Sequence, residues 1–173
     1  MKRKWTVVIW IAAIVLAFTA LYVIYSGNRP DQGTAQGKSA ASNFTLPDLS
    51  GKKVSLSDYK GKIVFLNFWA TWCKYCVMEM PELNSLNEEF LKGKDAVIVT
   101  VDVGESREQA EKFMKDRNFS LPVLLDADGS VSDRYGVDGF PNTFVIDRDG
   151  SVRDVIAGAT TRETLLQYYE KYK

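Results

Sequence analysis

The chain has 173 residues, enough for one domain with a hydrophobic core and a short appendage, and its 22 basic and 22 acidic residues cancel. It contains no histidine, which excludes Cys–His and Ser–His–Asp nucleophiles, HExxH zinc sites and histidine-ligated haem, and its two cysteines are too few for an ordinary zinc site. Residues 43–173 carry 17 basic and 21 acidic side chains without a basic stripe, which argues against nucleic acid as a partner. We therefore expect neither a metal nor a cofactor.

The N-terminus predicts a membrane anchor. Residues 1–4 read MKRK and form a basic tail, and residues 5–25 are 21 uncharged positions that would span the hydrocarbon core of a bilayer as a helix. The positive-inside rule keeps the tail in the cytoplasm and places the remaining chain outside the cell membrane. A cleaved signal peptide is the alternative, but the bulky LYVIY end offers no small-x-small cleavage site. No cysteine follows the apolar run, which excludes a lipoprotein anchor, and the basic flank disfavours a buried core helix.

Residues 26–42 are small and polar without apolar periodicity, which predicts a flexible linker. From residue 43 to 173, strand-like and helix-like runs alternate, which is typical of an α/β sheet covered on both faces. We predict hairpins over 44–56, with its turn at Ser50-Gly51, and over 142–158; buried strands at 62–69 and 95–103; a short strand at 121–126; and helices over 73–91, 106–118, 129–136 and 160–173, the second and last with Ser and Thr caps.

Both cysteines lie in one stretch, NFWATWCKYCVMEMP, after an apolar strand and at the start of a helical pattern. At a helix N-terminus the sulfur of Cys73 faces unpaired N–H groups and the positive end of the helix dipole, which should lower the pKa of its thiol. The pattern predicts that Cys73 is the exposed nucleophile that attacks a partner disulfide and that Cys76 resolves the mixed disulfide. An inert structural disulfide is the alternative, but closing so short a loop would stabilise the fold only weakly.

Glu79 lies three residues after Cys76 and should project from the same side of the helix, where its carboxylate could exchange a proton with a thiol. We expect Glu79 to be buried, against the alternative of a solvated surface glutamate. Pro81 removes a helix hydrogen bond and should kink the helix.

These segments resemble the thioredoxin superfamily, and more narrowly the membrane-anchored TlpA/ResA/CcmG-like thiol–disulfide oxidoreductases. The matching residues are NFWATWCxxC, the EMP that follows, the GFPNTFVIDRDG segment and the N-terminal anchor. The resemblance covers residues 43–173 and implies a thioredoxin-like α/β fold with an N-terminal β-hairpin extension and a central strand–helix insertion. It also implies a cis peptide between Phe140 and Pro141 beside the CxxC turn. We take Trp72, Phe140 and Pro141 as the substrate-binding residues.

Thioredoxins have a buried aspartate at the position of Asn67, and the resemblance to the ResA branch implies that Glu79 takes the acid–base role instead. Most of the branch has Pro before the second cysteine, whereas this chain has Lys74-Tyr75, so the direction of electron flow stays open. The resemblance implies disulfide-bearing exported proteins as substrates, with apocytochrome c a plausible one, and a CcdA/DsbD-type membrane protein as electron donor. Spore-envelope or other secreted disulfide proteins are equally open as substrates.

Rival functions are a disulfide oxidant or isomerase of the same fold, a thiol peroxidase, and a non-enzymatic binding module. Peroxiredoxins share the superfamily but have Thr or Ser three residues before the cysteine, where this chain has Ala70. The DADG (126–129) and DRDG (147–150) segments lack the spacing of a calcium loop and predict ordinary turns. The remaining aromatic residues predict core or near-surface packing rather than a cofactor site: Phe65, Phe68, Trp69, Phe113, Phe144, Tyr168 and Tyr169.

Overall fold

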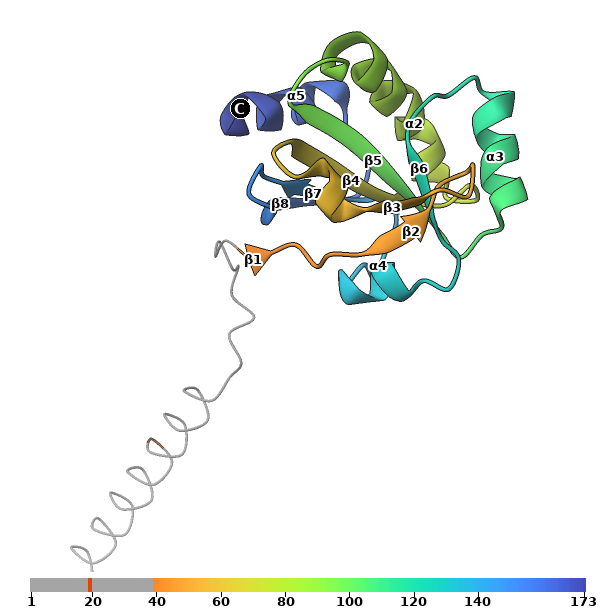
Figure 1. The fold of residues 1–173 in the computed structure, drawn as a ribbon, viewed down its shortest axis with the longest axis horizontal. Coiled ribbons are helices and arrows are strands. Elements are labelled where there is room, and N and C mark those ends of the chain that lie inside the picture. Colours follow the sequence, from red (N-terminus) through yellow and green to blue (C-terminus); the bar gives the residue numbers. More distant parts are fainter. Residues whose placement is uncertain (1–18, 20–38) are drawn as a thin grey trace, which may run out of the picture. The chain divides into compact units, whose positions relative to one another are not determined.

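The computed structural model describes Thr19 and residues 39–173. The centre of residues 39–173 is a six-stranded mixed sheet with the strand order β1-β8-β7-β4-β5-β6 (Figure 1). β4 pairs in parallel with β5, and β5 with β6, while β7, β8 and β1 complete the other side in antiparallel pairs. The strands of this sheet are β1 (Ser39–Ala40), β4 (Ile63–Trp69), β5 (Ala96–Val103), β6 (Val123–Asp126), β7 (Asn142–Ile146) and β8 (Ser151–Ala157).

Both faces of the sheet are covered, as the alternating pattern predicted. Three helices pack on one face and share its apolar core: α2 (Lys74–Leu86), α3 (Arg107–Asp116) and α5 (Arg162–Tyr172). The other face is covered by the antiparallel hairpin β2 (Thr45–Pro47) and β3 (Lys53–Ser55), the 3₁₀ turn η1 (Leu56–Tyr59) and the short helix α4 (Ser130–Arg134) (Figure 1). Because β4 lies between these layers, all seven of its residues are buried.

Side-chain caps begin the longer helices where the sequence predicted them. Ser106 accepts the Gln109 N–H before α3, and Thr161 accepts the Thr164 N–H before α5. Helix α3 ends at Asp116, whereas the sequence predicted that it would continue to Asn118. The difference arises because Asn118 adopts a left-handed backbone with φ 54°. α2 continues through Pro81 to Leu86 and passes into a π-helical turn, η2 (Asn87–Leu91).

The folded region begins earlier than the predicted boundary at residue 43. Ser39 and Ala40, assigned from the sequence to the linker, pair with Val152 and Ser151 as strand β1. This prediction was wrong at its C-terminal end because two small exposed residues pair through backbone atoms alone and leave no apolar pattern. The predicted anchor at 5–25 lies outside the described residues except for Thr19, and within the part of the chain that the structure describes no helix is long and apolar enough to cross a bilayer.

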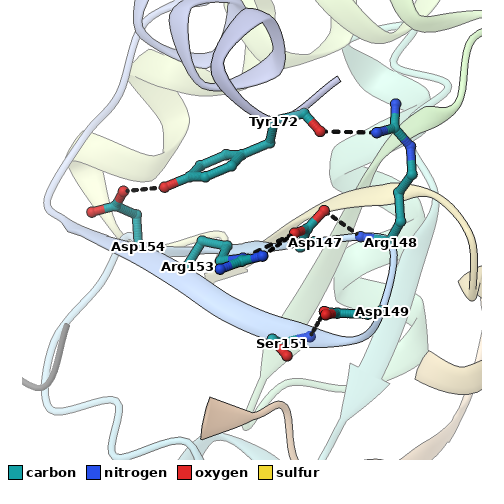
Figure 2. A network of polar contacts seen from close by, with 7 residues as sticks. All are labelled: Asp147, Arg148, Asp149, Ser151, Arg153, Asp154 and Tyr172. Atoms are coloured by element: carbon teal, nitrogen blue, oxygen red, sulfur yellow. Dashed lines mark hydrogen bonds and ion pairs between the residues drawn. The ribbon is translucent and has the colours of Figure 1, made fainter. Parts of the chain in front are cut away.

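A network of polar contacts connects the C-terminal end of α5 to the β7–β8 turn and to strand β8 (Figure 2). The Arg148 guanidinium donates to the Tyr172 carbonyl oxygen at 2.9 Å and pairs with Asp95. The Tyr172 hydroxyl donates to Asp154 at 3.0 Å. Within the turn, Asp149 accepts the Ser151 N–H. The DRDG segment therefore forms a turn, as predicted.

Candidate active site

Cys73 and Cys76 form a disulfide at the N-terminus of α2, with their Cα atoms 5.2 Å apart. Cys73 is the N-cap residue, and its sulfur accepts the N–H of Cys76 at 3.2 Å. Cys73 exposes 6% of its surface and Cys76 none. The prediction that Cys73 is exposed is therefore wrong for this disulfide form, in which Cys73 belongs to the apolar core, although it exposes more of its surface than Cys76 does.

A short loop carries the chain from the buried strand β4 to this helix start. β4 ends at Trp69, and the Cys73 N–H donates to the Ala70 carbonyl oxygen at 3.2 Å across the loop. This turn holds Cys73 at the N-terminus of α2, where the Cys76 N–H donates to its sulfur. The arrangement is the strand-to-helix junction that the sequence predicted.

Glu79 is buried, with 2% of its surface exposed, as predicted. Its neighbour Met80 is also buried, whereas Met78 points to solvent and is 63% exposed. One Glu79 oxygen, Oε1, accepts from Asn67 Nδ2 at 2.8 Å, and the other, Oε2, accepts the Thr160 backbone N–H at 2.8 Å. Burial raises the pKa of Glu79 to about 7, although both hydrogen bonds lower it.

Asn67 connects Glu79 to the sheet. Its amide nitrogen also donates to Thr143 Oγ1 at 2.9 Å, on the neighbouring strand β7. Sequence reasoning identified Asn67 and Glu79 but missed Thr143 and Thr160, which lie 76 and 81 residues away from their partners. No local pattern marks these two threonines, because the contacts exist only after β7 pairs with β4 and the loop before α5 packs against α2.

An aromatic hollow of about 490 Å³ lies beside the disulfide. Trp72 and Phe140 line it, with their rings edge to face and 5.9 Å between centroids. The Phe140–Pro141 peptide is cis, as predicted, and Pro141 itself is buried. Cys73 and the Lys74-Tyr75 dipeptide also line the hollow, and the remaining lining residues, which the sequence did not single out, are Val137, Asp138 and Gly139.

Trp72 is 70% exposed and Tyr75 is 61% exposed, so the rim of the hollow presents aromatic side chains to solvent. Exposed aromatic side chains beside a reactive group are typical of a protein-binding surface. The predicted residues Trp72, Phe140 and Cys73 therefore meet at one surface. Pro141, predicted with them as a substrate-binding residue, is buried and does not line the hollow, and Glu79 is buried in α2.

The other sequence-predicted features have structural roles. The predicted core aromatic residues pack in the two apolar clusters of the sheet. In the DADG segment, Asp126 accepts backbone N–H groups of Val131 and Ser132 and so caps α4. Among the described residues, no group of three acidic, cysteine or histidine side chains is placed to hold a metal ion.

Sequence reasoning also missed a pair of buried carboxyl groups, Asp102 and Glu105, at the end of β5. Glu105 holds the loop before Cys73 by accepting from the Thr71 N–H and hydroxyl at 2.5 Å and 2.6 Å. The segment VTVDVGES did carry a signal, because an acidic residue inside an otherwise apolar buried strand is uncommon.

A cysteine pair at a helix N-terminus, a buried carboxyl group that titrates near neutrality and an adjacent aromatic surface together support thiol–disulfide exchange with a polypeptide. The comparisons with known proteins agree with this chemistry. The profile of the AhpC/TSA family matches residues 38–155. The thiol-disulfide oxidoreductase ResA of Geobacillus thermodenitrificans is 38% identical over 174 residues, covering 100% of this chain and 99% of the relative.

Two solved structures share the fold. A thiol:disulfide interchange protein of the DsbE type from Chlorobium tepidum superposes with a TM-score of 0.72 at 33% identity, over 78% of this chain and 96% of that one. The exposed lipoprotein thioredoxin Etrx1 of Streptococcus pneumoniae superposes with a TM-score of 0.64 at 32% identity, over 75% of this chain and 99% of that one. The fold is therefore thioredoxin-like, and the chain belongs to the AhpC/TSA family and, within it, to the ResA-type thiol–disulfide oxidoreductases.

Proposed function

We propose that this oxidoreductase works as a reductant of disulfides in exported proteins, with Cys73 as nucleophile, Cys76 as resolving thiol and Glu79 as proton carrier. The observation that carries the proposal is the Cys73–Cys76 disulfide at the start of α2 with the buried Glu79 one turn further along the helix. A carboxyl group with a pKa of about 7 can both accept and return a proton at neutral pH.

The reaction starts from the reduced enzyme. The Cys73 thiolate attacks one sulfur of the substrate disulfide, forming a mixed disulfide and releasing the second substrate sulfur as a thiolate that takes up a proton. Glu79 accepts the proton of Cys76, and the resulting thiolate attacks the Cys73 sulfur. This step closes the Cys73–Cys76 disulfide and releases the first substrate thiol, which takes the proton back. Two electrons pass to the substrate, and an external dithiol donor returns them to the enzyme.

The same proposal places the domain outside the cell membrane, held by an anchor at residues 5–25. The support is the basic tail followed by a long uncharged apolar run in the sequence, together with a solved relative that is an exposed lipoprotein. Structural disulfides persist in such oxidising compartments, so an active donor is needed to keep the pair reduced. A CcdA/DsbD-type membrane protein fits this need, and apocytochrome c is one proposed substrate beside spore-envelope and other secreted disulfide proteins.

The direction of electron flow is tested by the reduction potential of the pair, measured at pH 7 against glutathione and dithiothreitol buffers. A reductant should have a potential near that of thioredoxin, about −270 mV, whereas a value near −120 mV identifies an oxidant. This measurement is decisive because the chain has Lys74-Tyr75 between its cysteines, which leaves the direction of electron flow open. Both residues also line the hollow beside Cys73.

The substrate is tested by trapping. In a Cys76→Ser variant the mixed disulfide at Cys73 cannot resolve, so the substrate stays attached and can be identified from membranes by mass spectrometry. A Cys73→Ser variant is the matched control, because it lacks the attacking sulfur. Recovery of apocytochrome c supports the proposed substrate, recovery of other secreted proteins replaces it, and an equal yield from both variants contradicts the proposal.

A further inference from the structure

The ends of two parallel strands meet beneath the active-site loop. Trp69 at the end of β4 pairs in register with Asp102 near the end of β5. β4 continues into the loop that contains Thr71 and Cys73, and β5 continues into the loop that contains Glu105. Residues that follow the two strands are therefore held side by side.

Glu105 accepts hydrogen bonds from the active-site loop with both of its carboxylate oxygens. Oε2 accepts the Thr71 N–H at 2.5 Å, and Oε1 accepts the Thr71 hydroxyl at 2.6 Å. The Glu105 side chain is nearly buried, with 7% of its surface exposed, and Thr71 precedes Cys73 by two residues. These two hydrogen bonds fix the loop on the side that faces β5.

Asp102 is fully buried and lies against Glu105. As a carboxylate it can only accept hydrogen bonds, and neither of its oxygens has a donor among the described residues. Two carboxylates in one buried place repel each other, so a single shared proton is favoured. Glu105 already accepts two hydrogen bonds from Thr71, whereas Asp102 accepts none from the described residues. Asp102 therefore holds the proton and can donate it to Glu105.

The charged groups on the neighbouring elements have other partners or are exposed to solvent. The Asp126 carboxylate on β6 accepts three hydrogen bonds from α4, and Glu79 on α2 is satisfied by Asn67 and Thr160. At the start of α3, Arg107 donates to the Leu49 carbonyl oxygen, and Glu108 on the same turn is exposed. Lys74, beside the cysteines at the start of α2, is exposed as well. Among residues 39–173, no lysine or arginine forms an ion pair with Asp102 or Glu105.

We propose that Asp102 and Glu105 form a carboxylic acid–carboxylate pair that positions the loop before Cys73, so that attack by Cys73 is fast while the pair holds one proton and slows when both groups are ionised. The two residues are positioning residues, since they act on Cys73 through Thr71. Burial first, and then the charge of Glu105, raise the pKa of Asp102 to about 8, which sets the pH at which the change occurs. The proposal holds for either direction of electron flow.

The test measures the rate of Cys73 attack for each ionised thiol. In the full-length chain with Cys76→Ser, the thiolate fraction is followed by ultraviolet absorbance, and the second-order rate with dithiobis-nitrobenzoate is divided by it from pH 6 to pH 10. We expect the rate per thiolate to fall about tenfold as the pH passes 8, because small misplacements of a nucleophile are costly. Asp102→Asn should abolish this fall, since an amide still donates to Glu105 but cannot ionise.

Three further variants separate loop positioning from general damage. Glu105→Gln should lower the rate per thiolate at every pH, because an amide cannot accept from Thr71 with both atoms. Thr71→Val, which removes one donor, should lower it less and should keep the fall near pH 8. Asp126→Asn changes a buried carboxyl group that holds α4 instead of the loop, and it should follow the parent. The proposal is wrong if Asp102→Asn keeps the fall near pH 8, if Thr71→Val reacts at the parent's rate per thiolate, or if Asp126→Asn also removes the fall.

Discussion

Glu79 accepts a hydrogen bond from the backbone N–H of Thr160 at 2.8 Å, across 81 residues of sequence. This hydrogen bond connects α2, which begins at the cysteines, to the loop that precedes the last helix, α5. Together with Asn67 it lets a carboxyl group remain buried, and burial raises the pKa of that group to about 7. The acid–base chemistry of the site therefore depends on the packing of the whole domain.

The first prediction concerns stability and pH. The pKa of Glu79 rises from 4.5 to about 7 on folding, so between these values the folded protein binds more protons than the unfolded chain. Its free energy of unfolding should then fall as the pH rises from 4.5 to 7, by at most about 3 kcal/mol from this group. Glu79→Gln should remove that part of the slope in urea unfolding of the oxidised protein. Glu82→Gln, on the exposed side of the same helix, is the control and should leave the slope unchanged.

The second prediction concerns the resolving step. Glu79 is the proposed acceptor of the Cys76 proton, and a glutamine at position 79 cannot take up that proton. Glu79→Gln should slow closure of the Cys73–Cys76 disulfide about 100-fold at pH 7 and lose the dependence on a group titrating near 7. Single-turnover mixing of the preformed mixed disulfide measures this rate directly. An unchanged rate and pH profile in Glu79→Gln would exclude the proposed proton transfer.

The third prediction concerns Asn67, which donates to both Glu79 and Thr143. Asn67→Asp places a second carboxyl group against Glu79 and removes the amide donor. The free energy of unfolding should drop by about 3 kcal/mol at pH 8, where both groups tend to ionise, and by about 1 kcal/mol at pH 5, where a shared proton restores a hydrogen bond. Urea unfolding at the two pH values measures the difference.

Asn84→Asp provides the matched comparison for this substitution. Asn84 is also buried, but its Oδ1 accepts from the Ser120 N–H, and an aspartate keeps that acceptor. Its effect on stability should be smaller than that of Asn67→Asp at pH 8. Equal losses for the two variants would show that proximity to Glu79 is not the cause.

The fourth prediction concerns the aromatic hollow. Trp72 and Phe140 contact each other at its edge, and Trp72 is largely exposed. Trp72→Ala combined with Phe140→Ala should lower kcat/KM for reduction of insulin, a protein disulfide, about tenfold, because exposed aromatic residues contribute strongly to protein binding. Reaction with a small disulfide should change much less. Val155→Ala, at an exposed apolar residue on β8 outside the lining of the hollow, should alter neither rate.

Much of the fold was predictable because its signals are local. The apolar run of β4, the Ser and Thr caps of α3 and α5, and the glycine turns of both hairpins each depend on a few neighbouring residues. Strand β1 was missed because Ser39 and Ala40 pair only through their backbone with a strand more than a hundred residues later. The extent of the last turn of α3 depended on the conformation of Asn118, which its sequence neighbours do not determine.

The sequence by itself determined the chemistry of this protein: a cysteine pair at a strand-to-helix junction, a glutamate one turn further on, and the family that these residues indicate. Only the tertiary structure decided which groups surround that chemistry. The donors to Glu79, the aromatic hollow and the Asp102–Glu105 pair arise where distant strands and loops meet. Reactivity follows residue type and local backbone, whereas desolvation and hydrogen-bond partners follow from packing between segments far apart in the chain.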